Sequence, residues 1–270
     1  MSENCSFKII HPEYKIVGFD GTGRVYSSNP SLSQIPKVLR HAIIPHEGNK
    51  FLYADLAQAE FYILVKWSRC QTLIDVYESG EDLYTKIAQT VFSKDSISEE
   101  ERDTMKAVIL SILYGSEGNS AARALHISEE EAKSLVERFM FTYPEIAKFQ
   151  ERAYKFTVDN GYTQSFYFRP RILKESVDDG DLSRKRQCVN NAIQNTCSDA
   201  LKMCIRELGV VSQIKFVTTV FDSVLFEVPK EFTDEEAKTF LTHFFSHCYP
   251  FKFRFEYAMG DTWGDAQDQL

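Results

Sequence analysis

The stretch from Ile214 to Val228, IKFVTTVFDSVLFEV, constrains the fold of this chain more than any other. Two β-branched and apolar runs flank Phe221, Asp222 and Ser223, a pattern that predicts a strand, a tight turn and a second strand. An unpaired carboxylate facing the core would cost roughly several kcal/mol. We therefore expect Asp222 either to lie at an exposed hairpin tip or to hold a cation. A turn aspartate without a further role is the alternative at this point.

The composition is that of a globular protein. The chain has 270 residues, of which 43% are apolar and 26% charged, enough for one large domain or two ordinary ones. It has no membrane-length apolar run and no secretion signal, and its six cysteines have no paired CxxC spacing. We expect free thiols, a cytoplasmic location and no membrane partner. The net charge of −8 excludes a protein that is basic all over, but leaves room for a local nucleic-acid surface.

The order of elements predicts an α+β fold, a small antiparallel sheet with a large helical insertion. Strands are expected at 51–55, 214–219, 224–228 and 251–257, and residues 1–50 look irregular. Helices are expected at 56–67, 71–78, 83–91, from Ser96 to 113, from 127 to Pro144, from there to 159, at 184–208 and from Thr233 to 247, with an extended arm or hairpin at 162–173. This gives three parts: an N-terminal segment with the first strand (1–60), a mainly helical insertion (61–160), and the remainder with the hairpin 214–228 (161–270).

Two acids fall on the expected sheet. Asp55 ends one strand and Asp222 lies in the hairpin of the same sheet. Two carboxylates brought together repel each other, so they favour a divalent cation between them. Magnesium takes oxygen ligands and completes its shell with water and substrate phosphates, and two such ions suit phosphoryl transfer.

A helix in the insertion carries a second group of candidates. Arg102, Lys106 and Tyr114 recur along one side of it. The two cations fit a triphosphate, and the ring fits a base. The alternative is a solvated helix face, in which Glu99 and Asp103 pair with the cations and Tyr114 belongs to the core.

Six segments, in order, make the chain resemble family A DNA polymerases, the bacterial DNA polymerase I type, from about Thr22 to the C-terminus. The family's motifs have counterparts in TGRVYSSNPSLSQIP (22–36), DLAQAE (55–60), RDTMKAVILSILYG (102–115), GYTQSFYFRPR (161–171), RQCVNNAIQNTCSDA (186–200) and VFDSVLFEV (220–228). The resemblance implies that 1–60 and 161–270 belong to a palm and that 61–160 form the fingers. It also implies a DNA-templated DNA polymerase that binds primer–template DNA and deoxynucleoside triphosphates.

The resemblance assigns roles residue by residue. Asp55 and Asp222 would hold two Mg²⁺ ions, with Mn²⁺ as an alternative, and the carbonyl of Leu56 would complete the metal shell. The nucleotide-binding set would be Arg102 and Lys106 on the triphosphate, Tyr114 at the insertion site, Gln58 near the nascent pair, Glu60 as the steric gate and Leu110 beside the sugar and base. The DNA-binding set would be Arg24, Arg169, Arg171, Arg186, Asn190 and Gln194.

Several positions depart from the family pattern. Leu110 replaces an aromatic residue, which would weaken stacking on the nucleotide by about 1–3 kcal/mol. Phe221 and Ser223 flank Asp222 where the family has a histidine and a second acid. Tyr84 replaces a histidine, and Pro170 replaces one arginine. We therefore expect a slower enzyme with altered sugar discrimination or fidelity.

Only some 20 residues precede the TGR segment, where the family places an exonuclease-type domain and a thumb. We expect weak, distributive DNA binding and a minimal or split polymerase, from a virus of bacteria, with a second polypeptide supplying thumb or processivity function. The main alternative is a non-catalytic palm that serves as a DNA-binding or replisome scaffold subunit. A relative that makes RNA is a third reading, which Glu60 disfavours.

Overall fold

The computed structural model describes residues 8–16, 23–113, 116, 118–172, 182–208 and 213–270, with residues 182–186 as backbone alone. The chain forms two compact units. Unit 1 combines Met1–Ala57 with Ala200–Leu270, and unit 2 is Gln58–Asp199. Mostly helical, with a small antiparallel sheet, the structure confirms the predicted α+β class. None of the helices in the described part of the chain is both long and apolar enough to cross a membrane.

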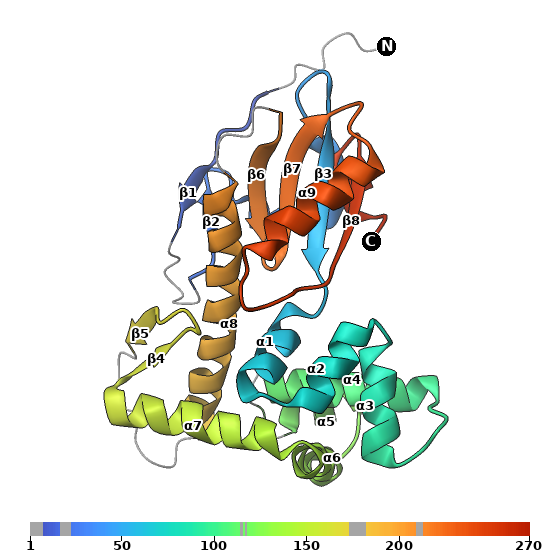
Figure 1. Cartoon of the computed structure of the whole chain (residues 1–270), viewed down its shortest axis with the longest axis vertical. Coiled ribbons are helices and arrows are strands. Elements are labelled where there is room, and N and C mark those ends of the chain that lie inside the picture. The colour runs from blue at the N-terminus through green and yellow to red at the C-terminus, as the bar shows by residue number, and fades with distance from the viewer. Residues whose placement is uncertain (1–7, 17–22, 114–115, 117, 173–181, 209–212) are drawn as a thin grey trace. The chain divides into compact units, whose positions relative to one another are not determined.

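Unit 1 is built on a four-stranded antiparallel sheet (Figure 1). Its order is β6 (Lys215–Val220), β7 (Ser223–Pro229), β3 (Asn49–Leu56) and β8 (Phe255–Gly260). The predicted hairpin is confirmed, since β6 and β7 pair with only Phe221 and Asp222 between them. β3 is central and pairs with both β7 and β8.

The last strand differs from its prediction of 251–257. It begins at Phe255 because β3 ends at Leu56, which is the partner of Phe255 in the ladder. The segment before it is held by its buried Phe251 and Phe253 side chains instead. The alternation of apolar residues thus begins at Phe251, four residues before the paired strand.

The two faces of the sheet pack against different elements. On one face, Phe51 and Tyr53 of β3 join a buried cluster with Trp263 of α10 (Trp263–Gln267). On the other face, Phe226 of β7 packs on α9 (Asp234–Ser246), with its ring centroid 5.2 Å from that of Phe244. Each of these side chains stabilises the fold by roughly 1.5–3 kcal/mol of apolar burial.

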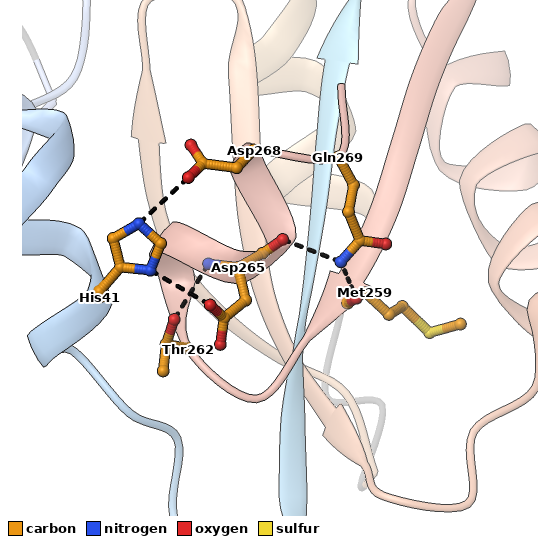
Figure 2. Close-up of polar contacts among 6 residues, drawn as sticks. All are labelled: His41, Met259, Thr262, Asp265, Asp268 and Gln269. Carbon is orange, nitrogen blue, oxygen red and sulfur yellow. Dashed lines mark hydrogen bonds and ion pairs between the residues drawn. The ribbon is translucent and has the colours of Figure 1, made fainter.

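Polar contacts hold the C-terminal turn of unit 1 in place (Figure 2). His41, on the 3₁₀ helix η2 (Lys37–Ala42), lies between two carboxylates, with its ring nitrogens 3.1 Å from oxygens of Asp265 and Asp268. The Gln269 amide donates to the carbonyls of Met259 and Asp265 at 3.0 and 2.8 Å. These contacts fix α10 against the sheet face that carries Asp55.

The N-terminal region is more regular than expected. It contains the strands β1 (Glu13–Lys15) and β2 (Tyr26–Ser28), which pair antiparallel, and the 3₁₀ helices η1 (Leu32–Gln34) and η2. Elements of three to six residues leave too few positions for a periodic pattern, so the sequence did not reveal them.

Unit 2 is mainly helical. Its elements are α1 (Ala59–Ser68), α2 (Gln71–Ser79), α3 (Leu83–Phe92), α4 (Glu99–Leu113), α5 (Asn119–Leu125), α6 (Glu129–Thr142), α7 (Pro144–Asn160), the hairpin of β4 (Tyr162–Gln164) and β5 (Pro170–Ile172), and most of α8 (Leu182–Glu207), which continues into unit 1. The expected helices are present, and the arm predicted at 162–173 is a hairpin as far as Ile172, with residue 173 outside the described residues. The short α5 was not predicted.

Helix caps explain where two of these helices begin. α4 starts at Glu99 rather than near Ser96, because the Ser98 hydroxyl accepts the N–H of Glu101 at 3.2 Å and the Glu101 carboxylate accepts the N–H of Ser98 at 3.0 Å. Ser128 and Glu131 make the same reciprocal pair at the start of α6.

Candidate active site

The sheet of unit 1 brings Asp55 and Asp222 close together. Asp55 lies near the end of β3 and pairs with Ser223, the first residue of β7. Asp222 is in the turn just before it, and the N–H of Leu56 donates to the carbonyl of Asp222 at 3.4 Å. The β3–β7 pairing therefore joins two acids that are far apart in the sequence.

Electrostatics at this pair favour a positively charged ligand. The pKa of Asp55 is raised to about 7 by burial, and then by the negative charges of Asp222 and Glu256, while Lys37 acts in the opposite direction. Burial also raises the pKa of Asp222, against a backbone hydrogen bond and the charge of Arg24. The ionised form of both carboxylates is disfavoured in these surroundings, so a cation that neutralises their charge would be bound favourably.

The donor set fits magnesium. Within the described residues, no three His, Cys, Asp or Glu side chains converge into a ready-made metal cage. Magnesium does not require one, since it is held by one or two carboxylates together with waters and substrate phosphates. The carbonyl of Leu56 as a third ligand stays a prediction.

The two departures beside Asp222 have different surroundings. Phe221 is 62% exposed, with a φ of 60°, and the Arg24 guanidinium lies over its ring at 5.0 Å. Ser223 is only 1% exposed, and its hydroxyl donates to the carbonyl of Val220 at 2.7 Å and accepts from Tyr53 at 2.8 Å. The structure thus brings Arg24, Phe221 and Asp222 together and turns Ser223 inward.

In unit 2, α4 presents the predicted row of side chains on its outer face. Lys106 and Leu110 are exposed and Arg102 is half-buried, while Met105 and Ile109 on the opposite face are buried. The expected ion pair between Arg102 and Asp103 is present, with an N–O distance of 3.7 Å, but it is not the main contact of Arg102.

The main partner of Arg102 is a residue that sequence reasoning missed. Asp82 caps α3, and its two carboxylate oxygens accept from Nε and Nη2 of Arg102 at 2.9 and 2.8 Å. The Tyr84 ring lies 5.5 Å from the Arg102 guanidinium and 5.9 Å from the Lys106 ammonium. The capping pattern before Leu83 was readable from the sequence, but the pairing across 20 residues was not.

Gln58 and Glu60 lie where α1 begins. Gln58 is its N-cap residue with a left-handed φ of 51°, and Glu60 is in the first turn. Both side chains are half-buried.

The predicted DNA-binding residues of unit 2 lie on the β4–β5 hairpin and α8. Arg169 is held within the unit, where its Nε donates to Asp199 at 2.6 Å. Arg171 donates to the Asn191 side chain. Asn190 and Gln194 are half-buried. Arg186 is described only as α8 backbone, and Tyr114 lies outside the described residues.

Comparisons with known proteins agree with this fold. The family model for DNA polymerase family A matches residues 3–265. The chain belongs to that family. It is 29% identical over 231 residues to DNA polymerase I of Caldicellulosiruptor bescii, covering 79% of this chain and 27% of that protein. It is also 29% identical over 262 residues to DNA polymerase I of Borreliella burgdorferi, a match that covers 90% of this chain and 29% of that protein.

A solved structure gives the same result. The polymerase domain of Pol1 from M. smegmatis, in complex with DNA primer–template and dNTP, superposes with a TM-score of 0.82 at 26% identity. The match covers 95% of this chain and 48% of that one. The chain thus spans less than a third of these two curated relatives and about half of the solved domain. These bacterial matches lend no support to the expected viral origin.

Proposed function

We propose that this chain is a DNA-templated DNA polymerase that extends a primer 3′-hydroxyl with deoxynucleoside triphosphates. The observation that carries the proposal is the Asp55–Asp222 pair in a member of this family. Asp55 lies on β3, Asp222 lies in the turn that leads into the neighbouring β7, and burial raises the pKa of both carboxylates. A non-functional acid pair of this kind would only destabilise the fold.

Unit 1 would supply the palm and its carboxylates. Asp55 and Asp222, with the Leu56 carbonyl, would hold two magnesium ions, Mn²⁺ being an alternative. When bound, these ions neutralise charge on the attacking and leaving oxygens during displacement at the α-phosphate. Arg24, beside Asp222, would contact the primer or template and restrain the exposed hairpin tip.

Unit 2 would supply the fingers in residues 61–160. The proposed grip on the triphosphate comes from Arg102, a planar fork, and Lys106, a point charge, both supported by Tyr84. Gln58, Glu60, Leu110 and Tyr114 would surround the sugar and the nascent base pair.

DNA contacts would come from Arg171, Arg186, Asn190 and Gln194. Arg169 is better explained as a support, because its ion pair with Asp199 holds the base of the β4–β5 hairpin on α8. Removing Arg169 would then disturb the hairpin before it disturbed any phosphate contact.

A non-catalytic DNA-binding or replisome scaffold is the second candidate. It is favoured by Ser223, whose buried hydroxyl takes the place of an acid, and by the engagement of Arg102 with Asp82.

Primer extension by the purified chain, with Mg²⁺ and all four deoxynucleotides, distinguishes a polymerase from a non-catalytic scaffold. Asp222→Asn is the control, because it removes a charge without changing the shape of the side chain. Extension by the wild type that is lost in the variant supports the polymerase. Primer–template binding without extension, at high enzyme and low salt, supports the scaffold.

A further inference from the structure

One row of side chains crosses the sheet at the level of Asp55. In the antiparallel register Asp55 lies opposite Ser223 on β7 and opposite Glu256 on β8. Directly opposed residues of an antiparallel pair project from the same face, with Cβ atoms about 4.5–5.5 Å apart. Ser223, Asp55 and Glu256 therefore share the face that carries Tyr53 and the buried cluster around Trp263.

The Ser223 end of this row offers no charge to a cation. The hydroxyl is buried and uses its proton on the Val220 carbonyl and a lone pair on Tyr53. An acid at this position would have to be buried in the same contacts. The carboxylate that the family motif places next to Asp222 is thus absent, and the structure gives Ser223 a packing role instead.

The Glu256 end offers a carboxylate. Glu256 is exposed, so its side chain is free of the packing that fixes Ser223. As the direct ladder partner of Asp55, it lies one strand away from that carboxylate on the same face of the sheet. The cations in the same neighbourhood are Lys37, near Asp55, and Arg24, near Asp222.

We propose that Glu256 is the third carboxylate of the metal site and takes over, from β8, the charge that Ser223 has lost from β7. It is a positioning residue, which acts on the hydration shell of a divalent cation held by Asp55 and Asp222. This inference rests on the proposed function, since it requires that site to bind metal.

The test is Mn²⁺ binding to the whole chain at pH 8, without DNA or nucleotide. Binding is measured as the decrease of the electron paramagnetic resonance signal of free Mn²⁺. We expect Glu256→Gln to weaken binding about tenfold, the lower end of the effect of outer-shell ligands. Glu256→Asp keeps the charge and should recover part of the loss. Glu231→Gln, at an exposed turn of the same unit, removes an equal charge and should bind like the wild type.

The outcomes separate this inference from the function on which it rests. Saturable binding to the wild type, abolished by Asp55→Asn but equal in Glu256→Gln and Glu231→Gln, would overturn the role of Glu256 and leave the two-aspartate site intact. No saturable binding to a wild type with a normal unfolding transition would overturn both. Unfolding curves of each variant show whether a loss of binding reflects a loss of fold.

Discussion

The guanidinium of Arg102 and the carboxylate of Asp82 form a two-pronged ion pair, with N–O distances of 2.9 and 2.8 Å. Hydrogen bonds from Arg102 are the largest cause that lowers the pKa of Asp82 to about 2. The side chain proposed to grip a triphosphate thus already has an anionic partner. A nucleotide that engages Arg102 in the same way must displace Asp82.

Asp82→Asn should therefore lower the KM for deoxynucleotides about three- to tenfold with little change in kcat. Asparagine caps a helix as well as aspartate does, so α3 should remain intact. Steady-state single-nucleotide insertion measures both constants. Asp103→Asn is the matched control, since Asp103 makes only a 3.7 Å contact with the same guanidinium. An increased KM in Asp82→Asn would instead show that Asp82 orients Arg102 for the nucleotide.

Asp55→Asn should abolish extension while stabilising the metal-free protein at neutral pH. The folded-state pKa of Asp55, about 7, lies above its ordinary value of 3.8. The group therefore favours the folded state fully below pH 4, and this contribution is lost as the pH rises to 7 and above. For this partly screened carboxylate we expect a gain of about 1–2 kcal/mol in the variant at pH 8.

Urea unfolding in EDTA at pH 5 and pH 8 measures this effect. The wild type should lose more stability between the two pH values than Asp55→Asn, and Mg²⁺ should restore it only in the wild type. Parallel pH profiles in the two proteins would contradict the prediction.

Leu110→Phe should strengthen nucleotide binding. Leu110 lies on the outer face of α4 and is 38% exposed, so a ring fits without a clash in the core. An added stacking surface is worth about 1 kcal/mol, or a five- to tenfold lower KM for deoxynucleotides. Leu110→Met changes the shape without adding a ring and serves as the control. Equal KM values in the two variants would place Leu110 away from the bound base.

Thr233→Ala should destabilise unit 1 by about 1 kcal/mol. The Thr233 hydroxyl accepts the N–H of Glu236 at 3.2 Å, and the Glu236 carboxylate accepts the N–H of Thr233 at 2.7 Å, so one substitution breaks a reciprocal cap. Thr239→Ala, exposed in the middle of the same helix, should be neutral or slightly stabilising because alanine is the better helix former. Equal unfolding midpoints for the two variants would rule out a stabilising cap.

The sequence predicted those parts of the fold that depend on local pattern. The β6–β7 hairpin follows from alternating apolar residues around Phe221 and Asp222, and the caps of α6 and α9 follow from serine or threonine before acids. The short, alanine-rich α5 has no such signal at its start. The start of β8 depended on where its partner β3 ends, which periodicity does not encode.

The candidate site divides in the same way. The closeness of Asp55 and Asp222 was predictable, because Asp55 ends one apolar strand and Asp222 lies between two others of the same sheet. The residues that contact or face the predicted site residues were not predictable. Asp82 meets Arg102 only through the packing of α3 on α4, and Glu256 meets Asp55 only through the register of β8. Glu256 did carry a sequence signal, since Lys252, Arg254 and Glu256 alternate with phenylalanines.

The position of β3 at the centre of its sheet sets an order of assembly during synthesis. Both of its neighbours, β7 and β8, belong to the segment Ala200–Leu270, so all of Gln58–Asp199 is synthesised before either neighbour exists. Until then β3 is an apolar strand with two open edges, the kind of segment that aggregates or binds chaperones in nascent chains. Asp55 therefore acquires its carboxylate neighbours only after Gln58–Asp199 has been synthesised.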